Sequence, residues 1–393
     1  MGNIFRHTVR LPNPLTEKNV FASALLIITQ QTGKMKKLAV ILLFFYGLPG
    51  FGQYPPVTIP GSEIRKISSK IVTGQEYELH ILLPGGYRNN EKKYPVVYLM
   101  DAQWDFPLLK SIYGQQYYDG FIPELIIVGV TWGGKNPNPD SLRVRDYTPT
   151  NDGRIQSGGA DRFLSFMRNE LFPFMENNYR ADASNRSIMG CSLGGLITLY
   201  ALFTQPDLFK GYAAASPAIS WDKNVLDQYE KKYFESKPSM PGRLFMSFGS
   251  VERGLPRFQQ LSALMKARNY PGLQVRSVVL ENTGHSGTKS ETFGRGIQYI
   301  FERPRLKLDN AVLEMYKGFY ASDNGSMTEI KIDGQGLVFQ FNPSNKYLLY
   351  ASGGFSFYSD AEYFNLEFKQ ESGVINGFQL NRYGSSIFYK KIK

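Results

Sequence analysis

The sequence predicts an α/β protein, with a doubly wound, mostly parallel sheet followed by a small antiparallel β domain. Between residues 63 and 304, short apolar runs alternate with amphipathic helical patterns. One run, 126–130, carries no polar side chain, as is typical of a strand buried on both faces of a parallel sheet. After residue 305 the pattern changes to brief alternating segments separated by glycine-containing turns.

The elements of the first domain follow from these patterns. Strands are expected over 77–84, 94–100, 124–132, 211–215, 243–248 and 275–280, with a further strand ending at Gly190. Two amphipathic helices are expected, one over 160–178 and one that carries Phe258, Leu261, Leu264 and Met265. The polar stretch between Trp221 and Pro241 fits either a cap over the sheet edge or a solvated surface helix.

The second domain, 305–393, is predicted to contain only β-strands and a short helix over 311–316. Its expected strands are 329–332, 337–341, 347–350, 355–358, 364–368, 378–381 and 387–389. The hairpin signals between them are Asn324-Gly325, Asp333-Gly334, Gly353-Gly354 and Asn376-Gly377. The domain has no histidine and no cysteine, so we expect no chemistry of its own.

A secretory signal peptide is predicted over residues 35–52. Met35-Lys36-Lys37 is followed by the apolar run 38–46, which is too short to span a bilayer, and by Gly50-Phe51-Gly52. Met35 is therefore expected to be the true start, with 1–34 an over-called extension and 53–304 the first domain. We expect a secreted or periplasmic protein without a stable membrane anchor, and an uncleaved N-terminal anchor is the alternative.

Charge and cysteine content exclude several classes of site. The formal net charge is +11, but residues 1–52 carry six basic side chains and one acidic one, which leaves 39 basic and 33 acidic side chains. No basic block points to nucleic acid. Cys191 is the only cysteine, and the three histidines are His7, His80 and His285. We therefore predict no disulfide, no metal site and no cofactor.

The segment 187–195, Ser-Ile-Met-Gly-Cys-Ser-Leu-Gly-Gly, contains the pattern Gly-x-Ser-x-Gly. It lies between an apolar strand and an apolar helix that begins near Leu196. A serine on such a tight turn exposes its hydroxyl, and the flanking glycines let two backbones pass closely. Ser192 is therefore the predicted nucleophile. Cys191, the neighbouring alternative, is expected to be a small packed residue.

A nucleophilic serine needs a base and an orienting acid, which in α/β-hydrolases follow in the order Ser, acid, His. His285 is the predicted base because it follows a strand in Thr-Gly-His-Ser-Gly. Glu252 is the favoured acid because it stands in a turn directly after a strand, with Asp222 the weaker rival. Seven carboxylates qualify by position: Asp207, Asp222, Asp227, Glu230, Glu235, Glu252 and Glu281.

The remaining site residues are expected at the ends of strands. The N–H groups of Leu193 and Gln103 are predicted to form an oxyanion hole. Trp104 and Trp221 either line an aromatic pocket or cap the core, and Trp132 is the weaker pocket candidate. Arg145, with Arg143, either binds an anionic substrate or forms a structural pair with Asp146.

Six sequence blocks resemble the esterase D family of α/β-hydrolases. They are Tyr-Pro-Val-Val-Tyr-Leu-Met-Asp (94–101), Arg-Asp-Tyr-Thr-Pro-Thr (145–150), Gly-Gly-Ala-Asp-Arg-Phe-Leu (158–164), Gly-Cys-Ser-Leu-Gly-Gly (190–195), Ala-Ser-Pro-Ala-Ile-Ser-Trp (215–221) and Gly-Ser-Val-Glu (249–252). The resemblance covers residues 60–303, and three of the blocks look most like the siderophore (enterochelin-type) esterase branch. One departure is Cys191, where the family often has histidine. Residues 306–393 resemble a β domain appended to some penicillin-binding-protein-like serine hydrolases.

The resemblance implies a serine esterase that acts on a small-molecule ester, anionic or aromatic, and that opens siderophore trilactones, and the predicted signal peptide implies that it is exported. The family also includes feruloyl and acetyl-sugar esterases, so a carbohydrate esterase is the alternative enzyme. A binding protein that kept the fold and lost catalysis is the alternative from another class.

Overall fold

The computed structural model describes residues 58–392, apart from 154, 155, 237, 238, 240, 335, 343, 361–363, 383 and 384. The predicted signal peptide and the segment before it lie outside the described residues. Within the described part of the chain, no helix combines the length and the apolar character needed to cross a bilayer.

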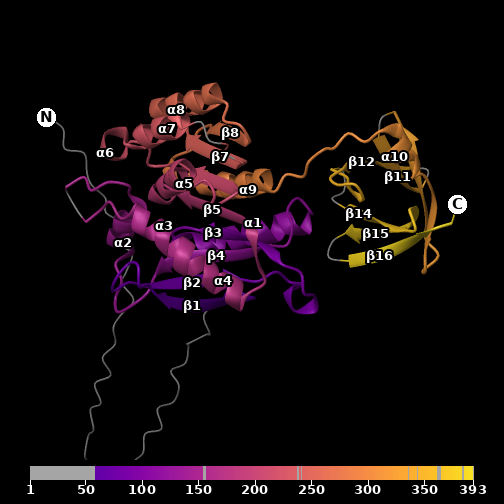
Figure 1. Cartoon of the computed structure of the whole chain (residues 1–393), viewed down its shortest axis with the longest axis horizontal. Helices are drawn as coiled ribbons and strands as arrows, with labels where there is room; N and C mark the ends of the chain where they lie inside the picture. The colour runs from indigo at the N-terminus through magenta and orange to yellow at the C-terminus, as the bar shows by residue number, and fades with distance from the viewer. Residues whose placement is uncertain are drawn as a thin grey trace, which may run out of the picture. The chain divides into compact units, whose positions relative to one another are not determined.

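A mixed eight-stranded sheet forms the core of the first domain (Figure 1). Its strands, in spatial order, are β1 (Ser62–Ser68), β2 (Glu76–Leu82), β4 (Ile126–Trp132), β3 (Tyr94–Leu99), β5 (Ala181–Cys191), β6 (Gly211–Ala215), β7 (Gly242–Gly249) and β8 (Leu273–Leu280). β1 pairs antiparallel with β2, β2 pairs antiparallel with β4, and all other neighbours are parallel. The predicted mostly parallel sheet is therefore confirmed.

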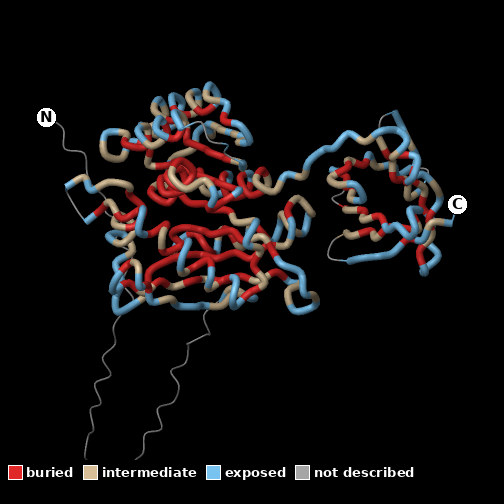
Figure 2. Tube along the Cα trace, viewed as in Figure 1, coloured by how far each residue is buried: buried red, intermediate tan, exposed pale blue. Residues whose placement is uncertain are grey.

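Helices cover both faces of this sheet, because successive side chains of a strand point to opposite faces. Val97 and Leu99 of β3 pack in one apolar cluster with α1 (Ala102–Tyr118) and α9 (Thr288–Ile300). Val96 and Tyr98 pack in a second cluster on the other face. That face carries α2 (Pro139–Tyr147), α3 (Ala160–Phe166), α4 (Phe172–Asn178), α5 (Leu193–Thr204), α7 (Leu226–Glu235) and α8 (Leu255–Arg268). β4 and β6 are buried along their whole length, and β5 is buried over its last five residues, which lead to Ser192 (Figure 2).

The helix predicted over 160–178 is present but is not uniformly α-helical. A π-helical turn over Met167–Leu171 joins α3 to α4, and the N–H of Phe172 donates to the carbonyl of Met167. Pro173 has no N–H to donate to the carbonyl four residues earlier, so a wider turn at this point costs the helix little.

The polar stretch after residue 221 forms a surface helix, which supports the second of the two alternatives. A short helix, α6 (Trp221–Asn224), leads into α7. α7 buries Leu226, Glu230 and Tyr233 and exposes lysines on its opposite side. Tyr229 packs edge-on against Tyr200 of α5, with ring centroids 4.9 Å apart.

The C-terminal domain is a closed antiparallel barrel, preceded by the short helix α10 (Asn310–Glu314). Its described strands are β9 (Gly318–Ser322), β10 (Met327–Asp333), β11 (Gly336–Asn342), β12 (Asn345–Ala351), β13 (Ser356–Tyr358), β14 (Asn365–Glu371), β15 (Val374–Arg382) and β16 (Ser385–Lys391). β10 to β16 match the seven predicted strands. β9, which was not predicted, pairs with both β10 and β16 and so closes the ring. Aromatic side chains, among them Phe339, Phe368 and Phe378, fill the interior.

One predicted hairpin in the barrel is wrong. Asn376-Gly377 lies inside β15, and the turn between β14 and β15 is made by Ser372 and Gly373, both with positive φ. Gly377 is needed for packing: a β-carbon there would lie 2.5 Å from both the Phe388 ring and the Tyr389 carbonyl oxygen. Close packing against a neighbouring strand therefore produces the same residue pattern as a turn.

Candidate active site

Ser192 lies between the end of β5 and the start of α5, as predicted. Its backbone has φ 60° and ψ −116°, a conformation that L-residues rarely adopt. A β-carbon at Gly190 would lie 2.7 Å from the Gly194 carbonyl carbon, and one at Gly195 would lie 2.9 Å from the Pro217 Cα. The glycines of the motif are therefore required by close backbone contacts around the serine.

The two N–H groups predicted for the oxyanion hole lie at the starts of neighbouring helices. Leu193 begins α5 and Gln103 is the second residue of α1, so neither N–H has an acceptor within its own helix. β3 and β5 are adjacent and parallel. A β-carbon at Gly194 would lie 3.1 Å from both Asp101 Oδ2 and Met100 Cβ, so the two helix starts are in contact. An oxyanion held by both N–H groups is consistent with this arrangement.

The structure brings His285 and Glu252 together. Glu252 stands three residues after β7, and His285 begins a short 3₁₀ turn, His285–Gly287. Nδ1 of His285 and Oε2 of Glu252 are 2.7 Å apart. The glutamate side chain is 11% exposed and the histidine side chain 50% exposed. The carboxylate is therefore shielded, while the imidazole remains accessible to a substrate.

Four of the other carboxylates that qualified by position are paired with cations elsewhere. Asp207 pairs with Arg168, Asp227 with Arg257 and Glu235 with Lys231. Glu230 accepts from Arg268 and from Tyr270. Of the seven candidates, Glu252 is the one that the structure pairs with His285.

Two hydroxyl groups beside this pair were missed in the sequence. Ser216 Oγ donates to Glu252 Oε1 at 2.6 Å and lies 2.8 Å from Thr288 Oγ1. Ser216 directly follows β6, the strand between those of the nucleophile and the acid. The sequence did contain one indication of this site, since Ser216 is a polar residue that directly follows an apolar strand.

Both candidate arginines are engaged in ion pairs. Arg143 donates from Nε and Nη2 to the two carboxylate oxygens of Asp101, at 2.9 and 2.8 Å. Arg145 donates to both oxygens of Asp146 and also to Gln75. For Arg145, the structure supports the second alternative, the structural pair with Asp146, because its donors are directed at that buried carboxylate.

The three tryptophans differ in their surroundings. Trp104 is 47% exposed, and the Arg143 guanidinium carbon lies 5.5 Å from its ring centroid. The indole N–H of Trp221 donates to the Thr150 carbonyl at 3.3 Å. Trp132 is buried and donates to Asp146 at 2.7 Å. Trp132 is thus a core residue, while Trp104 has the exposed ring that a substrate contact requires.

Cys191 is buried, and burial raises the pKa of its thiol to about 12. The thiolate is the reactive form, so this residue is unsuited to compete with Ser192 as the nucleophile. Among the described residues, no three His, Cys, Asp or Glu side chains gather as metal ligands.

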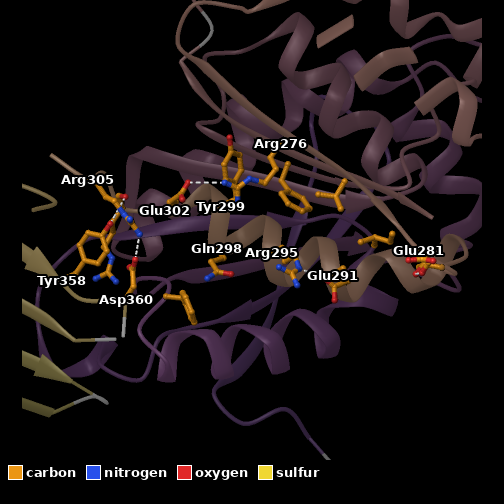
Figure 3. A pocket seen from close by; sticks show the side chains of 16 residues that line it. Arg276, Glu281, Glu291, Arg295, Gln298, Tyr299, Glu302, Arg305, Tyr358 and Asp360 are labelled. Carbon is orange, nitrogen blue, oxygen red and sulfur yellow. Dashed lines mark hydrogen bonds and ion pairs between the residues drawn. The ribbon is translucent and has the colours of Figure 1, made fainter. Parts of the chain in front are cut away.

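Charged side chains on β8, on α9 and just after α9 form ion pairs (Figure 3). Arg276 and Glu302 point toward each other, with Nη2 and Oε2 3.9 Å apart, and Arg276 also lies over the Tyr299 ring. Arg295 donates to Glu291 at 2.6 Å. Because these arginines have acidic partners, this surface offers little net positive charge to an anionic ligand.

Comparison with known proteins agrees with this geometry. The model of the esterase family, described as "Putative esterase", matches residues 69–326. The ferri-bacillibactin esterase BesA of Bacillus subtilis is 31% identical over 220 residues, which are 50% of this chain and 72% of that protein. The siderophore triacetylfusarinine C esterase of Aspergillus fumigatus is 28% identical over 213 residues, 52% of this chain and 72% of that protein.

A solved structure, the BES protein from Bacillus cereus, superposes with a TM-score of 0.58 at 26% identity. It covers 63% of this chain and 98% of its own. The family match spans well over half of the chain and includes Ser192, Glu252 and His285. The chain therefore belongs to this esterase family and is a serine esterase with an α/β-hydrolase core.

Proposed function

We propose that this protein is an exported serine esterase that hydrolyses the ester bonds of siderophore trilactones. The observation that carries the mechanism is the hydrogen bond between His285 Nδ1 and Glu252 Oε2. This bond directs Nε2, the other ring nitrogen, away from the carboxylate, where it can take a proton from a nucleophile. The substrate class is supported by the names of two relatives that each match over 72% of their own length.

In the proposed mechanism, Ser192 Oγ attacks the ester carbonyl while His285 Nε2 accepts the serine proton. Glu252 holds the imidazole in the required tautomer and stabilises the imidazolium. The N–H groups of Leu193 and Gln103 donate to the oxyanion, and one such donor is worth about 100- to 1,000-fold in rate. The imidazolium then protonates the leaving alkoxide, and water, activated by the same histidine, releases the acyl group.

The test is hydrolysis of two substrates by purified residues 53–393. One substrate is a ferric tricatecholate trilactone and the other is a feruloylated sugar. The Ser192→Ala variant is the inactive control. Trilactone opening that requires Ser192 would support the proposal. Hydrolysis of the feruloyl ester alone would replace it with the carbohydrate esterase.

The alternative of a binding protein that kept the fold and lost catalysis is tested with a fluorophosphonate probe. This probe labels an activated serine without any substrate recognition. We expect wild-type protein to be labelled and Ser192→Ala to remain unlabelled. A folded wild-type protein that resists the probe would instead favour the binding protein.

Export is proposed from the sequence of residues 35–52. The test is expression from Met35, fractionation of the cells and determination of the N-terminal residue of the exported protein. We expect Gln53. Retention of the apolar segment 38–46 in a membrane fraction would favour the uncleaved anchor.

A further inference from the structure

We infer that Ser216 and Thr288 are positioning residues. They hold Glu252 and His285 in a fixed position relative to the turn that carries Ser192. This inference rests on the proposed serine mechanism. It assigns a role to two buried hydroxyl groups, which we call the Ser216–Thr288 pair.

Ser216 fixes the orientation of the Glu252 carboxylate. Oε1 of Glu252 accepts from Ser216 Oγ at 2.6 Å and from the Gly249 N–H at 2.8 Å. With Oε1 held by two donors, Oε2 is left to face His285 Nδ1. A carboxylate held at one oxygen cannot rotate away from the imidazole without breaking both of those bonds.

Thr288 connects the same network to the histidine loop. It is the first residue of α9 and is fully buried. Its Oγ1 lies 2.8 Å from Ser216 Oγ and 2.8 Å from the His285 carbonyl oxygen. Because Ser216 gives its single proton to the carboxylate, Thr288 Oγ1 is the donor toward two neighbouring acceptors, Ser216 Oγ and that carbonyl, and it shares one proton between them. The pair therefore links the Glu252 side chain to the His285 main chain.

The turn that carries Ser216 also binds the nucleophile. The Ser192 N–H donates to the Ala215 carbonyl at 3.0 Å, and the Ala218 N–H donates to the Ser192 carbonyl at 3.0 Å. Ser216 has φ 38°, a strained value that persists only where the surroundings impose it. Its own N–H donates to the Ser247 carbonyl of β7 at 2.9 Å. One turn thus contacts the backbone of Ser192, the strand that precedes Glu252, and Glu252 itself.

These contacts separate positioning from substrate binding. Both hydroxyls are buried, so neither can contact a substrate. Their loss should lower kcat and leave KM almost unchanged, because only the alignment of the proton-transfer groups is affected.

The test uses hydroxyl deletions with matched controls. We expect Ser216→Ala to lower kcat on p-nitrophenyl acetate by about 10- to 100-fold, the worth of a hydrogen bond to a charged group. Ser216→Gly removes the hydroxyl and also relieves the backbone strain, and we expect the same loss. Thr288→Val should lower kcat by about threefold to tenfold, while Thr288→Ser should restore it.

Thr292→Val is the control on the same helix. Thr292 is buried one turn after Thr288 and bonds to Ser247 Oγ and the Thr288 carbonyl, without an observed bond to Glu252 or His285. We expect it to lower the thermal midpoint and leave kcat within about twofold of wild type.

A second readout needs no substrate. Residues 53–393 contain two histidines, His80 and His285, so histidine-selective ¹⁵N labelling resolves the proton shared between His285 Nδ1 and Glu252. We expect this proton in wild type and in Thr292→Val, and its broadening or loss in Ser216→Ala. If wild type hydrolyses no ester yet shows the proton, the proposed function fails while the positioning role is still tested by this signal. An unchanged proton in Ser216→Ala, or equal loss of kcat in Thr292→Val, would overturn the inference.

Discussion

Arg143 and Asp101 form a bidentate ion pair across 42 positions of sequence, with N···O distances of 2.9 and 2.8 Å. Asp101 has φ 58° and immediately precedes α1, the helix that carries Gln103. Its carboxylate also lies against Gly194, two residues after the nucleophile. The pair therefore supports the start of α1 where that helix meets the nucleophile turn, and Arg143 carries little net charge to offer an anionic substrate.

Removal of Arg143 should destabilise the protein in a pH-dependent way. The side chain of Asp101 is 2% exposed and that of Arg143 is 15% exposed. Arg143→Ala leaves a buried carboxylate without its cation, which typically costs about 3–5 kcal/mol of unfolding free energy. Arg143→Lys should recover only part of this, because an ammonium group cannot bond both oxygens in the same planar geometry.

Burial raises the pKa of Asp101 above its usual 3.8, and Arg143 opposes that rise. Folded Asp101 thus keeps its proton to a higher pH than unfolded Asp101 does. Where the native state binds more protons, the free energy of unfolding falls as pH rises. The loss caused by Arg143→Ala should therefore be larger at about pH 7 than at about pH 4, as measured by urea denaturation.

The matched control is Arg168→Ala, which removes a similar pair with Asp207 at an exposed site, where the two side chains are 40% and 64% exposed. We expect a loss of less than about 1 kcal/mol. Equal losses for the two variants would contradict the structural role assigned to Arg143.

Gly190 should tolerate no side chain. A β-carbon there would lie 2.7 Å from the Gly194 carbonyl carbon. The contact is with backbone, so no side-chain rotation can relieve it. We expect Gly190→Ala to lower the free energy of unfolding by about 2–4 kcal/mol and to abolish probe labelling of Ser192. Gly114 in α1 is the control, since a β-carbon there would meet nothing within 4 Å. Gly114→Ala should stabilise the protein by about 0.5–1 kcal/mol in thermal denaturation. A folded, labelled Gly190→Ala protein would contradict the packing argument.

The sequence predicts those parts of the site that depend on local context. Ser192 and Glu252 each follow a strand and precede a helix, and His285 follows the last strand of the sheet, so periodicity and chain order place all three. The same reasoning could not select the partner of Arg143. Asp146 is nearer in sequence, but Asp101 follows β3 and Arg143 lies on α2, which follows β4, so the two become neighbours through the pairing of β3 with β4.

The barrel shows the same limit. β9 begins at Gly318 and is only five residues long, so its sequence pattern is weak, and its assignment as a strand depends on pairing with β10 and with β16 at the far end of the domain. The pattern Asn376-Gly377 predicts a turn, because local sequence cannot reveal that the Phe388 ring occupies the space beside Gly377.

Ser192 should carry measurable backbone strain. A residue with φ 60° and ψ −116° costs of the order of 1–3 kcal/mol unless it is glycine. Ser192→Gly removes this strain, although glycine also gains about 0.4–1 kcal/mol of freedom in the unfolded chain. We expect Ser192→Gly to be more stable than Ser192→Ala by about 1 kcal/mol in chemical denaturation, with both variants inactive. Equal stability would mean that the turn is relaxed in solution.

Glu252→Gln should abolish most of the activity without unfolding the protein. The glutamine carbonyl can take the place of Oε1 and accept from Ser216 and Gly249, which directs its NH₂ group at His285 Nδ1. His285 Nδ1 must then accept a hydrogen bond, so the ring proton moves to Nε2, where it blocks proton transfer from Ser192. We expect kcat on a p-nitrophenyl ester to fall by about 10³- to 10⁴-fold with little change in KM.

Asp222→Asn is the control for this substitution, because Asp222 was the rival acid by chain order and the structure pairs Glu252 with His285 instead. We expect Asp222→Asn to retain kcat within about twofold, while fluorophosphonate labelling of Ser192 slows in Glu252→Gln alone. If Asp222→Asn loses activity as Glu252→Gln does, two carboxylates support the histidine during turnover. If Glu252→Gln keeps wild-type kcat, the hydrogen bond between Glu252 and His285 does not set the tautomer that the reaction needs.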